Sequence, residues 1–389
     1  MDVWLLVQPV GADLCRDQRD PAQHRRRAGA GSAEEVGQTV DFNLGEDRQL
    51  LASTLREILE DHCTPAAVRA SWDDAAGRVK DLWEILAGTG ILGLLAPEEN
   101  GGLELDERDL VLLLEELGRA ACPDPVAEHA AIAVPVLRDL APGALSDRWL
   151  AGAASGSFVL TAGSPLDSSV LAGATADLVV LPIDGAVHAV PREALVAVGQ
   201  VSVDGSRRLA TLTATVSAET LVSDSPVAID VLLDRGAWAA AAQGLGVAQR
   251  LLDLTVAYVA EREQFGRPVG VNQAVKHHCS NVAVALEFAR PLVQMAAWSL
   301  AKGRLPSGTM PSSVTASSVS VAVSMAKAAV SDALDLACRS ALQCHGAIGY
   351  TIEYDLQLWL KRGWALSAAW GDARCHRRRV AGALGLTGA

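Results

Sequence analysis

The chain reads Tyr258-Val259-Ala260-Glu261-Arg262-Glu263-Gln264-Phe265-Gly266-Arg267-Pro268-Val269-Gly270 across its most informative turn, and Asn272-Gln273-Ala274-Val275-Lys276-His277 follows. Glycine and proline punctuate this turn, because both interrupt regular helix. Helical patterns lie on either side of it, over about 235–263 and 271–304. Two more follow, over 311–344 and, shorter, over about 355–385. Four consecutive helical segments joined by short breaks predict an antiparallel four-helix bundle.

A second informative stretch closes the third of these helices. It reads Gln343-Cys344-His345-Gly346-Ala347-Ile348-Gly349-Tyr350-Thr351 and continues to Glu353-Tyr354-Asp355 and Lys361-Arg362. Glycine is common just after a helix end, where it forms the C-cap. Because it has no side chain, glycine also lets another molecule come close to the backbone. Both interpretations apply to Gly346.

The N-terminal part of the chain, residues 40–155, is also helical in pattern. Apolar residues recur at helical spacing in its first segment, at Leu50, Leu51, Leu55, Ile58 and Leu59. A helix over 79–89 leads into a loop at 90–102, and Asp106-Glu107 begin another helix that ends at Gly118. Residues 1–39 follow no helical or alternating pattern, which predicts a disordered extension. We hypothesise that the natural product begins near Val40.

Residues 156–225 have a different character. Short apolar runs of β type lie at 158–161, 178–182, 187–190 and 210–216, separated by Gly, Asp and Ser. We therefore expect an α+β fold with three parts: an α-helical N-terminal domain (40–155), a small and shortened middle β domain (156–225) and a C-terminal antiparallel four-helix bundle (226–389).

Composition excludes several classes of protein. The 389 residues carry 33 Lys and Arg against 46 Asp and Glu, and a net charge of −13 argues against nucleic acid as a partner. No apolar run reaches the length of a membrane span, and the first residues do not resemble a signal peptide. The seven cysteines are scattered without a CxxC pair, so neither a disulfide framework nor a metal site is expected. These features are typical of a cytoplasmic protein.

Together with the loop at 90–102, the two quoted stretches resemble the acyl-CoA dehydrogenase family. The resemblance covers about residues 40–389, and the family has the same order of helical, β and helical-bundle domains. It implies an FAD-dependent oxidoreductase of lipid metabolism that desaturates an acyl-CoA thioester. In this reaction a carboxylate removes the α-proton from within hydrogen-bond reach, and FAD accepts the β-hydrogen as hydride.

The first stretch carries residues that the resemblance implies for cofactor binding. Arg262 matches an arginine that contacts the diphosphate of FAD bound by a neighbouring subunit, a target that suits a guanidinium. The alternative for Arg262 is a salt bridge with one of its flanking glutamates. Gln264 and Phe265 belong to the same loop. Gln273 matches a glutamine that reaches the neighbour's FAD, with an exposed helix glutamine as the alternative.

The second stretch supplies three more cofactor residues by the same resemblance. Gln343, Gly346 and Ala347 match a Gln-x-x-Gly-Gly segment whose backbone lies close to the adenosine part of FAD. Ala347 replaces the second glycine of that segment, which narrows the space for the cofactor.

The family's catalytic glutamate is missing from its usual position. Counting along the chain from Gln343, that position holds Trp370, and an indole ring cannot accept a proton. A minority of the family places the base on the first bundle helix, which here corresponds to Arg235-Gly236. The loop that cradles the flavin ring in the middle domain is also degraded. Residues 160–167 keep only Thr161, a Gly-Ser pair and Asp167 of it.

These departures predict the base-lacking subunit of a heteromeric, actinobacterial-type acyl-CoA dehydrogenase. A related subunit with the catalytic glutamate would be its partner, in an α2β2 tetramer, and this chain would complete the partner's FAD site. Heteromeric relatives often act on bulky thioesters such as steroid side chains. One alternative is a self-sufficient homo-oligomer that uses Asp372 as base. Another is a flavin-free structural or acyl-CoA-binding subunit.

Overall fold

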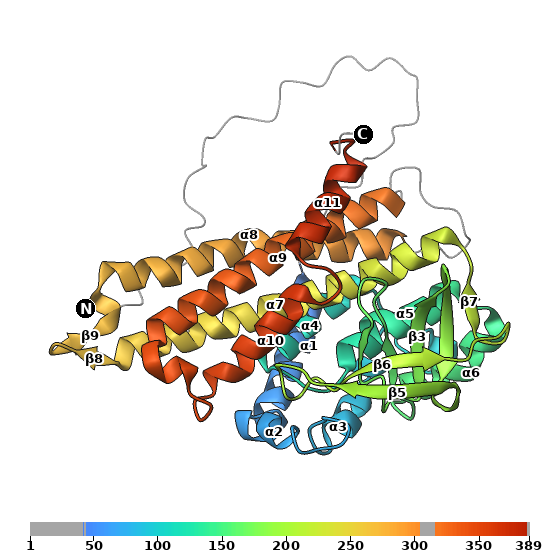
Figure 1. The fold of residues 1–389 in the computed structure, drawn as a ribbon, viewed down its shortest axis with the longest axis horizontal. Coiled ribbons are helices and arrows are strands. Elements are labelled where there is room, and N and C mark those ends of the chain that lie inside the picture. The colour runs from blue at the N-terminus through green and yellow to red at the C-terminus, as the bar shows by residue number, and fades with distance from the viewer. Residues whose placement is uncertain (1–41, 43, 304–315, 387–389) are drawn as a thin grey trace, which may run out of the picture. The chain divides into compact units, whose positions relative to one another are not determined.

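The computed structural model describes residue 42 and residues 44–303 and 316–386. The extension expected over 1–39 lies outside these residues. Within them, helices come first, strands follow over 160–223, and long helices return from Pro226 (Figure 1). The predicted fold class is therefore confirmed, while the domain boundaries and the shortening of the middle domain stay predictions.

The N-terminal part begins with α1 and is built around α4. A capping box starts α4: the side chain of Asp106 accepts the Arg108 N–H at 2.9 Å, and the side chain of Asp109 accepts the Asp106 N–H at 3.0 Å. Such reciprocal bonds satisfy donors that a helix start leaves free. A π-helical segment, Glu128–Ala133, leads into α5. The helices are α1 (Gly45–His62), α2 (Pro65–Ala70), α3 (Leu82–Gly88), α4 (Glu107–Arg119), α5 (Val134–Leu140) and α6 (Gly143–Ala154).

The middle part contains two small sheets. Their strands are β1 (Leu160–Ala162), β2 (Ser169–Leu171), β3 (Leu178–Ile183), β4 (Ala186–Pro191), β5 (Leu195–Gln200), β6 (Leu209–Ala214) and β7 (Leu221–Ser223). One sheet has the order β1-β3-β4-β7, in which β1 and β3 are parallel, and the other has the antiparallel order β2-β6-β5. The sequence pattern located β1, β3, β4 and β6. It missed β2 and β7, which have three residues each, and the edge strand β5, whose Val196 and Val198 face outward.

The C-terminal part consists of α7 (Pro226–Glu261), α8 (Gln273–Gly303), α9 (Ala316–His345), α10 (Leu356–Ala368) and α11 (Ala373–Ala383). The prediction of one helix over 355–385 was wrong. Trp370 and Gly371 have φ angles of 58° and 96°, and this left-handed backbone ends α10 before α11 begins. Among the described residues, no helix has the length and apolar character that crossing a bilayer requires.

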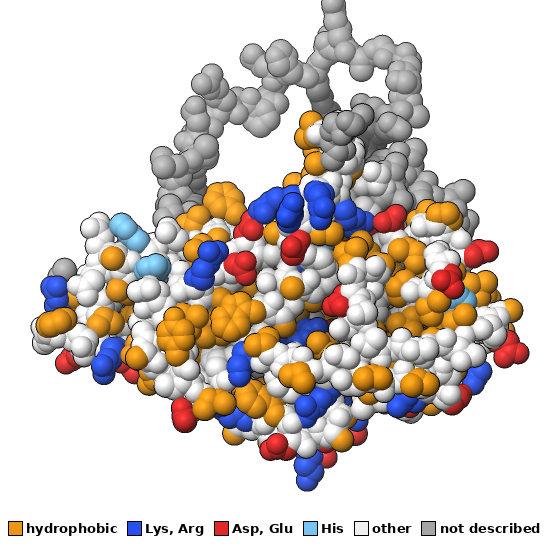
Figure 2. Space-filling view, in the orientation of Figure 1, with side chains coloured by type: hydrophobic (Ala, Val, Ile, Leu, Met, Phe, Trp, Pro, Cys, Tyr) orange, Lys and Arg blue, Asp and Glu red, His pale blue; other side chains and the backbone are white. Residues whose placement is uncertain are grey.

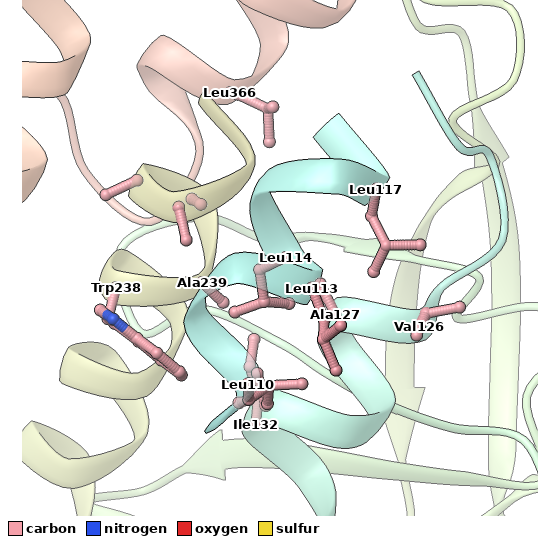
Figure 3. Packing of buried hydrophobic residues seen from close by; sticks show 14 of the residues in the cluster. Leu110, Leu113, Leu114, Leu117, Val126, Ala127, Ile132, Trp238, Ala239 and Leu366 are labelled. Atoms are coloured by element: carbon pink, nitrogen blue, oxygen red, sulfur yellow. The ribbon is translucent and has the colours of Figure 1, made fainter. Parts of the chain in front are cut away.

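The main core extends from the N-terminal helices into the bundle, and α4 packs along α7 inside it. Figure 3 shows Leu110 and Leu114 of α4 beside Trp238 of α7. Two glycines allow the helices to approach closely. A Cβ atom on Gly118 would lie 2.0 Å from the carbonyl oxygen of Gln243, and one on Gly246 would lie 1.8 Å from that of Glu115. No side chain fits at such distances, so the crossing requires glycine at both positions.

We expect Gly246→Ala to destabilise the fold by at least about 1–3 kcal/mol, because the added methyl group forces the two helix backbones apart. Gly382→Ala in α11 is a matched control: nothing lies within 4 Å of its Cβ position. The control should gain up to about 1 kcal/mol from the better helix propensity of alanine. Urea unfolding of both variants measures the difference, and equal stabilities would contradict this view of the crossing.

Candidate functional site

A short β-hairpin with a two-residue turn projects from the C-terminal end of α7. Its strands are β8 (Glu263–Gln264) and β9 (Arg267–Pro268). Phe265 and Gly266 form the turn with φ angles of 54° and 78°, the positive values that a type I′ hairpin requires at both positions. The side chain of Phe265 is fully exposed at the tip. An exposed phenylalanine in left-handed backbone is unusual and points to a role outside this chain's own core.

Arg262 lies at the base of this hairpin. Its N–H donates to the Tyr258 carbonyl at 2.8 Å, and its own carbonyl accepts the Val269 N–H at 2.8 Å. The backbone is thus fixed while the side chain is exposed. Within the described part of the chain, its guanidinium forms no ion pair, and the flanking Glu261 and Glu263 leave it free. The salt-bridge alternative for Arg262 therefore has no counterpart in the structure.

The second quoted stretch forms the exposed end of α9. Gln343 and Ala347 are exposed, and Gly346 has a φ angle of 63° as the chain enters the 3₁₀ turn η7 (Gly346–Tyr350). No atom lies within 4 Å of the Cβ position of Gly346. Its glycine character therefore serves the left-handed helix end here, and the space beside it is open to another molecule.

An aromatic cluster joins the two stretches. The ring of Tyr258 stacks on His345 with centroids 4.3 Å apart, and Tyr354 lies 5.5 Å from His345. His345 is buried and its Nδ1 contacts the Ala341 carbonyl at 2.8 Å, so it packs rather than catalyses. As a result the hairpin and the end of α9 lie at the same end of the bundle, together with the start of α8 (Figure 1). Gln273, the exposed first residue of α8, belongs to this end too.

Trp370 fills the position where the family's base was sought. It is 7% exposed, and its indole ring lies against Gly236 of α7, where an added Cβ would be 2.0 Å from the ring. The two positions considered for the base therefore meet in space, and neither presents a carboxylate. The neighbouring Arg235 points elsewhere and donates to Glu107 at 2.9 Å and Asp139 at 2.8 Å.

The backbone around Trp370 is held from two sides. His376 lies 2.9 Å from the Trp370 carbonyl through Nε2, while its Nδ1 lies 3.2 Å from the Ser324 hydroxyl. The buried ammonium of Lys327 donates to the carbonyls of Leu366 and Ser367 at 3.0 and 2.9 Å, which caps the end of α10. Burial lowers the pKa of Lys327 to about 7. Sequence reasoning missed these supports, since a lysine and a histidine in a helix give no sign of what they hold.

Asp372, the alternative base, is the N-cap of α11. Its carboxylate accepts the Cys375 N–H at 2.7 Å, and the residue is exposed. Asp234 of α7, a further carboxylate on the first bundle helix, is bound by Arg379 at 2.8 Å and by the Ser320 hydroxyl. Both carboxylates thus have structural partners of their own.

The buried His376 gives the fold a pH dependence with a definite sign. Burial lowers its pKa to about 4 from 6.5. Between these values the unfolded chain binds a proton that the folded chain does not. The free energy of unfolding therefore falls as the pH drops from about 6.5 to about 4, by up to about 3 kcal/mol for this residue. We expect His376→Gln, which keeps a donor for the Trp370 carbonyl, to reduce this dependence in urea titrations.

The exposed His62 supplies the control, because His62→Gln should leave the slope unchanged. The buried His129 also has its pKa lowered to about 4 by burial, so the dependence is reduced and not abolished. An unaltered slope in His376→Gln would show that His376 is not responsible.

Arginines gather on α11, and Figure 2 shows Lys and Arg side chains clustered at this helix. Arg379 pairs with Asp230 and Asp234, and Arg377 pairs with Asp332. Arg374 and Arg378 are exposed. Half of this charge is therefore already balanced, as expected of a cationic helix face in water.

The polar side chains of the middle-domain loop are used internally. The Thr161 hydroxyl donates to the Leu171 carbonyl at 2.7 Å, the Ser164 hydroxyl accepts the Leu166 N–H at 3.1 Å, and Asp167 accepts the Ser169 N–H at 3.0 Å. These bonds fold the loop on itself and engage the side chains of Thr161 and Asp167 within it.

Comparison with known proteins identifies the family. Residues 45–157 match the acyl-CoA dehydrogenase N-terminal domain, and residues 226–385 match the acyl-CoA dehydrogenase C-terminal domain. This chain belongs to the acyl-CoA dehydrogenase family. Acyl-CoA dehydrogenases are FAD-dependent enzymes, so the predicted family, enzyme class and cofactor are confirmed at that level.

Two named relatives are acyl-CoA dehydrogenases called IpdE2. The protein from Mycobacterium tuberculosis is 33% identical over 82% of this chain and 91% of its own length. The one from Mycolicibacterium smegmatis is 33% identical over 87% and 98%. Among solved structures, the ChsE4–ChsE5 complex from M. tuberculosis shares the fold, with a TM-score of 0.78 and 24% identity over 90% of this chain and 100% of that one.

FAD fits one part of this acyl-CoA dehydrogenase chain and not another. At the bundle end, Arg262 is an exposed cation with no ion pair among the described residues, which suits a diphosphate, and the open space at Gly346 suits an adenosine. Beside Trp370, the indole fills the space over Gly236, and the side chains of Thr161 and Asp167 are bonded within their own loop. The exposed residues at the bundle end therefore suit FAD better than those around Trp370 do.

Proposed function

We propose that this chain is the base-lacking subunit of a heteromeric acyl-CoA dehydrogenase and completes the FAD site of a related partner subunit. The observation that carries the proposal is the contrast between the two ends of the bundle. Trp370 closes the position of the base against Gly236, while Arg262 is exposed and unpaired among the described residues. An arginine available for FAD, in a chain whose own base position is filled by an indole, is best explained by an FAD site in another chain.

In this proposal the chain binds and orients, and the partner performs the proton removal. FAD, when bound, accepts the hydride that leaves the β-carbon of the acyl-CoA. Arg262 would neutralise the FAD diphosphate through a charge-assisted fork, which a guanidinium forms well. Gln264, Phe265 and Gln273 would line the same side of the cofactor, and Gln343, Gly346 and Ala347 would lie along its adenosine. The partner's glutamate would take the α-proton.

Named relatives support a two-chain assembly. A variant of the Tcur3481–Tcur3483 steroid ACAD resembles this chain with a TM-score of 0.76 and 25% identity, and its name joins two proteins. The name of the ChsE4–ChsE5 complex likewise joins two proteins. FadE34 of M. tuberculosis is 33% identical over 88% of this chain but over only 48% of its own length. That length leaves room for a second unit of similar size. We propose an α2β2 assembly in the cytoplasm, acting on a bulky thioester such as a steroid side chain.

The alternatives are less well supported. In a self-sufficient enzyme, Asp372 would have to release the Cys375 N–H. It would also have to reach the substrate from a position two residues beyond the usual place of the base. Misplacement by about 1 Å can lower a rate 100-fold, so a shift of this size is a large obstacle. A flavin-free subunit would leave the exposed Arg262 and Phe265 of the hairpin without a purpose.

Flavin content tests the proposal. The chain is produced alone and together with a related subunit that carries glutamate at the position of Trp370, and bound FAD is measured by absorbance after purification. We expect colourless protein alone and a yellow complex with one FAD per pair of unlike chains. FAD bound by the chain alone would support the homo-oligomer, and a complex that forms without FAD would support the flavin-free subunit.

A further inference from the structure

A cavity of about 150 Å³ lies at the junction of α1, α4, α7 and α10, among helices that pack side by side (Figure 1). It is separate from the bundle end described above and shares no lining residue with it. Its wall is partly apolar, from Leu59, Pro65 and Ala120, and partly basic, from three arginines. A cavity of about this volume can hold a ring the size of benzene.

Two of the three arginines are neutralised by partners. Arg56 forms a two-pronged bond to Glu116 at 2.8 and 2.5 Å. Arg119 bonds to Asp253 at 2.6 Å. These pairs are fixed parts of the wall, and each brings a cation and an anion together. Because each pair is neutral, the remaining side chains determine the net charge of the cavity wall.

Arg250 of α7 is the third arginine, and no hydrogen bond or ion pair satisfies it within the described ranges. Its guanidinium lies over the ring of Trp359, 5.2 Å from the centroid. Trp359 is 3% exposed, and its Nε1 donates to the Arg119 carbonyl at 2.8 Å, so the platform is rigid. Burial lowers the pKa of Arg250, and the nearby Arg119 acts in the same direction. A cation without a hydrogen-bond or ion-pair partner among the described residues thus lies beside a half-apolar cavity, and nearby carboxylates favour its charged form.

We propose that this cavity binds a small carboxylate with a compact apolar body of about four to seven carbon atoms. Arg250 would receive the carboxylate through its planar fork, and the apolar wall would cover the body of the ligand. Glu60 also lines the cavity, and its side chain is exposed to solvent. The apolar wall favours a carboxylate over inorganic phosphate, which has no apolar part to bury.

Benzoate is the probe that tests the site, with benzamide as its uncharged counterpart and inorganic phosphate as an anion without an apolar body. Calorimetric titration of the full chain, in its heteromer if required, should give a measurable benzoate affinity and at least about tenfold weaker binding of the other two. Arg250→Gln should weaken benzoate about tenfold or more, the effect of losing a hydrogen bond to a charged group.

Arg148→Gln is the matched control. Arg148 lies over Trp149 at the same 5.2 Å, but it is exposed on α6 and lines no part of this cavity. It should bind benzoate like the native chain. Ala120→Leu, which fills the cavity while keeping Arg250, should abolish binding. The proposal is overturned if benzoate does not bind, if phosphate binds as tightly, or if Arg250→Gln binds it unchanged.

Discussion

Replacing Arg262 with glutamine in the heteromer is expected to weaken FAD binding about 10- to 100-fold. The backbone of Arg262 is fixed by two hydrogen bonds, and its side chain is exposed. Its guanidinium has no ion pair among the described residues, so it is available for a diphosphate. Loss of a hydrogen bond to a charged group costs about 1.5–3 kcal/mol, which corresponds to this range. Release of FAD on dilution, followed by flavin fluorescence, measures the change.

Arg267→Gln is the control for this prediction. Arg267 is on the same hairpin and is also exposed, but its guanidinium donates to Asn272 at 3.2 Å and has no proposed contact with FAD. Its loss should alter FAD affinity less than about threefold, a surface-charge effect. If both variants lose FAD equally, the hairpin as a whole matters and Arg262 has no special role.

Trp370→Ala is expected to lower the free energy of unfolding of the chain by about 3–5 kcal/mol. The indole is buried in the space that Gly236 leaves, so its removal creates a cavity between α7 and the α10–α11 junction. Trp364 of α10, 41% exposed, is the matched control, and Trp364→Ala should cost much less. Urea unfolding compares the two.

Activity adds a second readout to the Trp370 variant. Trp370 is proposed to take no part in proton transfer. The heteromer with Trp370→Ala should therefore keep the native turnover per bound flavin, provided that it retains its FAD. A loss of turnover per flavin without a loss of stability would contradict a purely packing role for the indole.

The order of domains was predictable because long helices repeat their apolar residues every three to four positions, and α7, α8 and α9 are long enough to show this pattern. The strands β2 and β7 were not, because each has only two strongly apolar residues and shows no period, whereas β1 overlaps the apolar run at 158–161. The break at Trp370 was also hidden. A tryptophan in left-handed backbone is held there by tertiary contacts from His376 and Gly236, which local sequence does not encode.

Cofactor residues could be predicted only because the candidates lie in two continuous stretches. What sequence could not give was their relation in space. The stacking of Tyr258 on His345 joins the stretches, and the contact of Trp370 with Gly236 joins the two positions considered for a base. Both contacts link residues about ninety or more positions apart. The exposure of Phe265 is likewise a property of the folded hairpin and has no signal in composition.

Acyl-CoA-dependent reduction of an electron-accepting dye is the most direct test of the central idea that this chain supplies no catalytic base. It is measured for the chain alone, for the heteromer, and for the heteromer with Asp372→Asn in this chain. The account predicts no turnover by the chain alone and the same kcat for the two heteromers. Turnover by the chain alone that disappears in Asp372→Asn would contradict it.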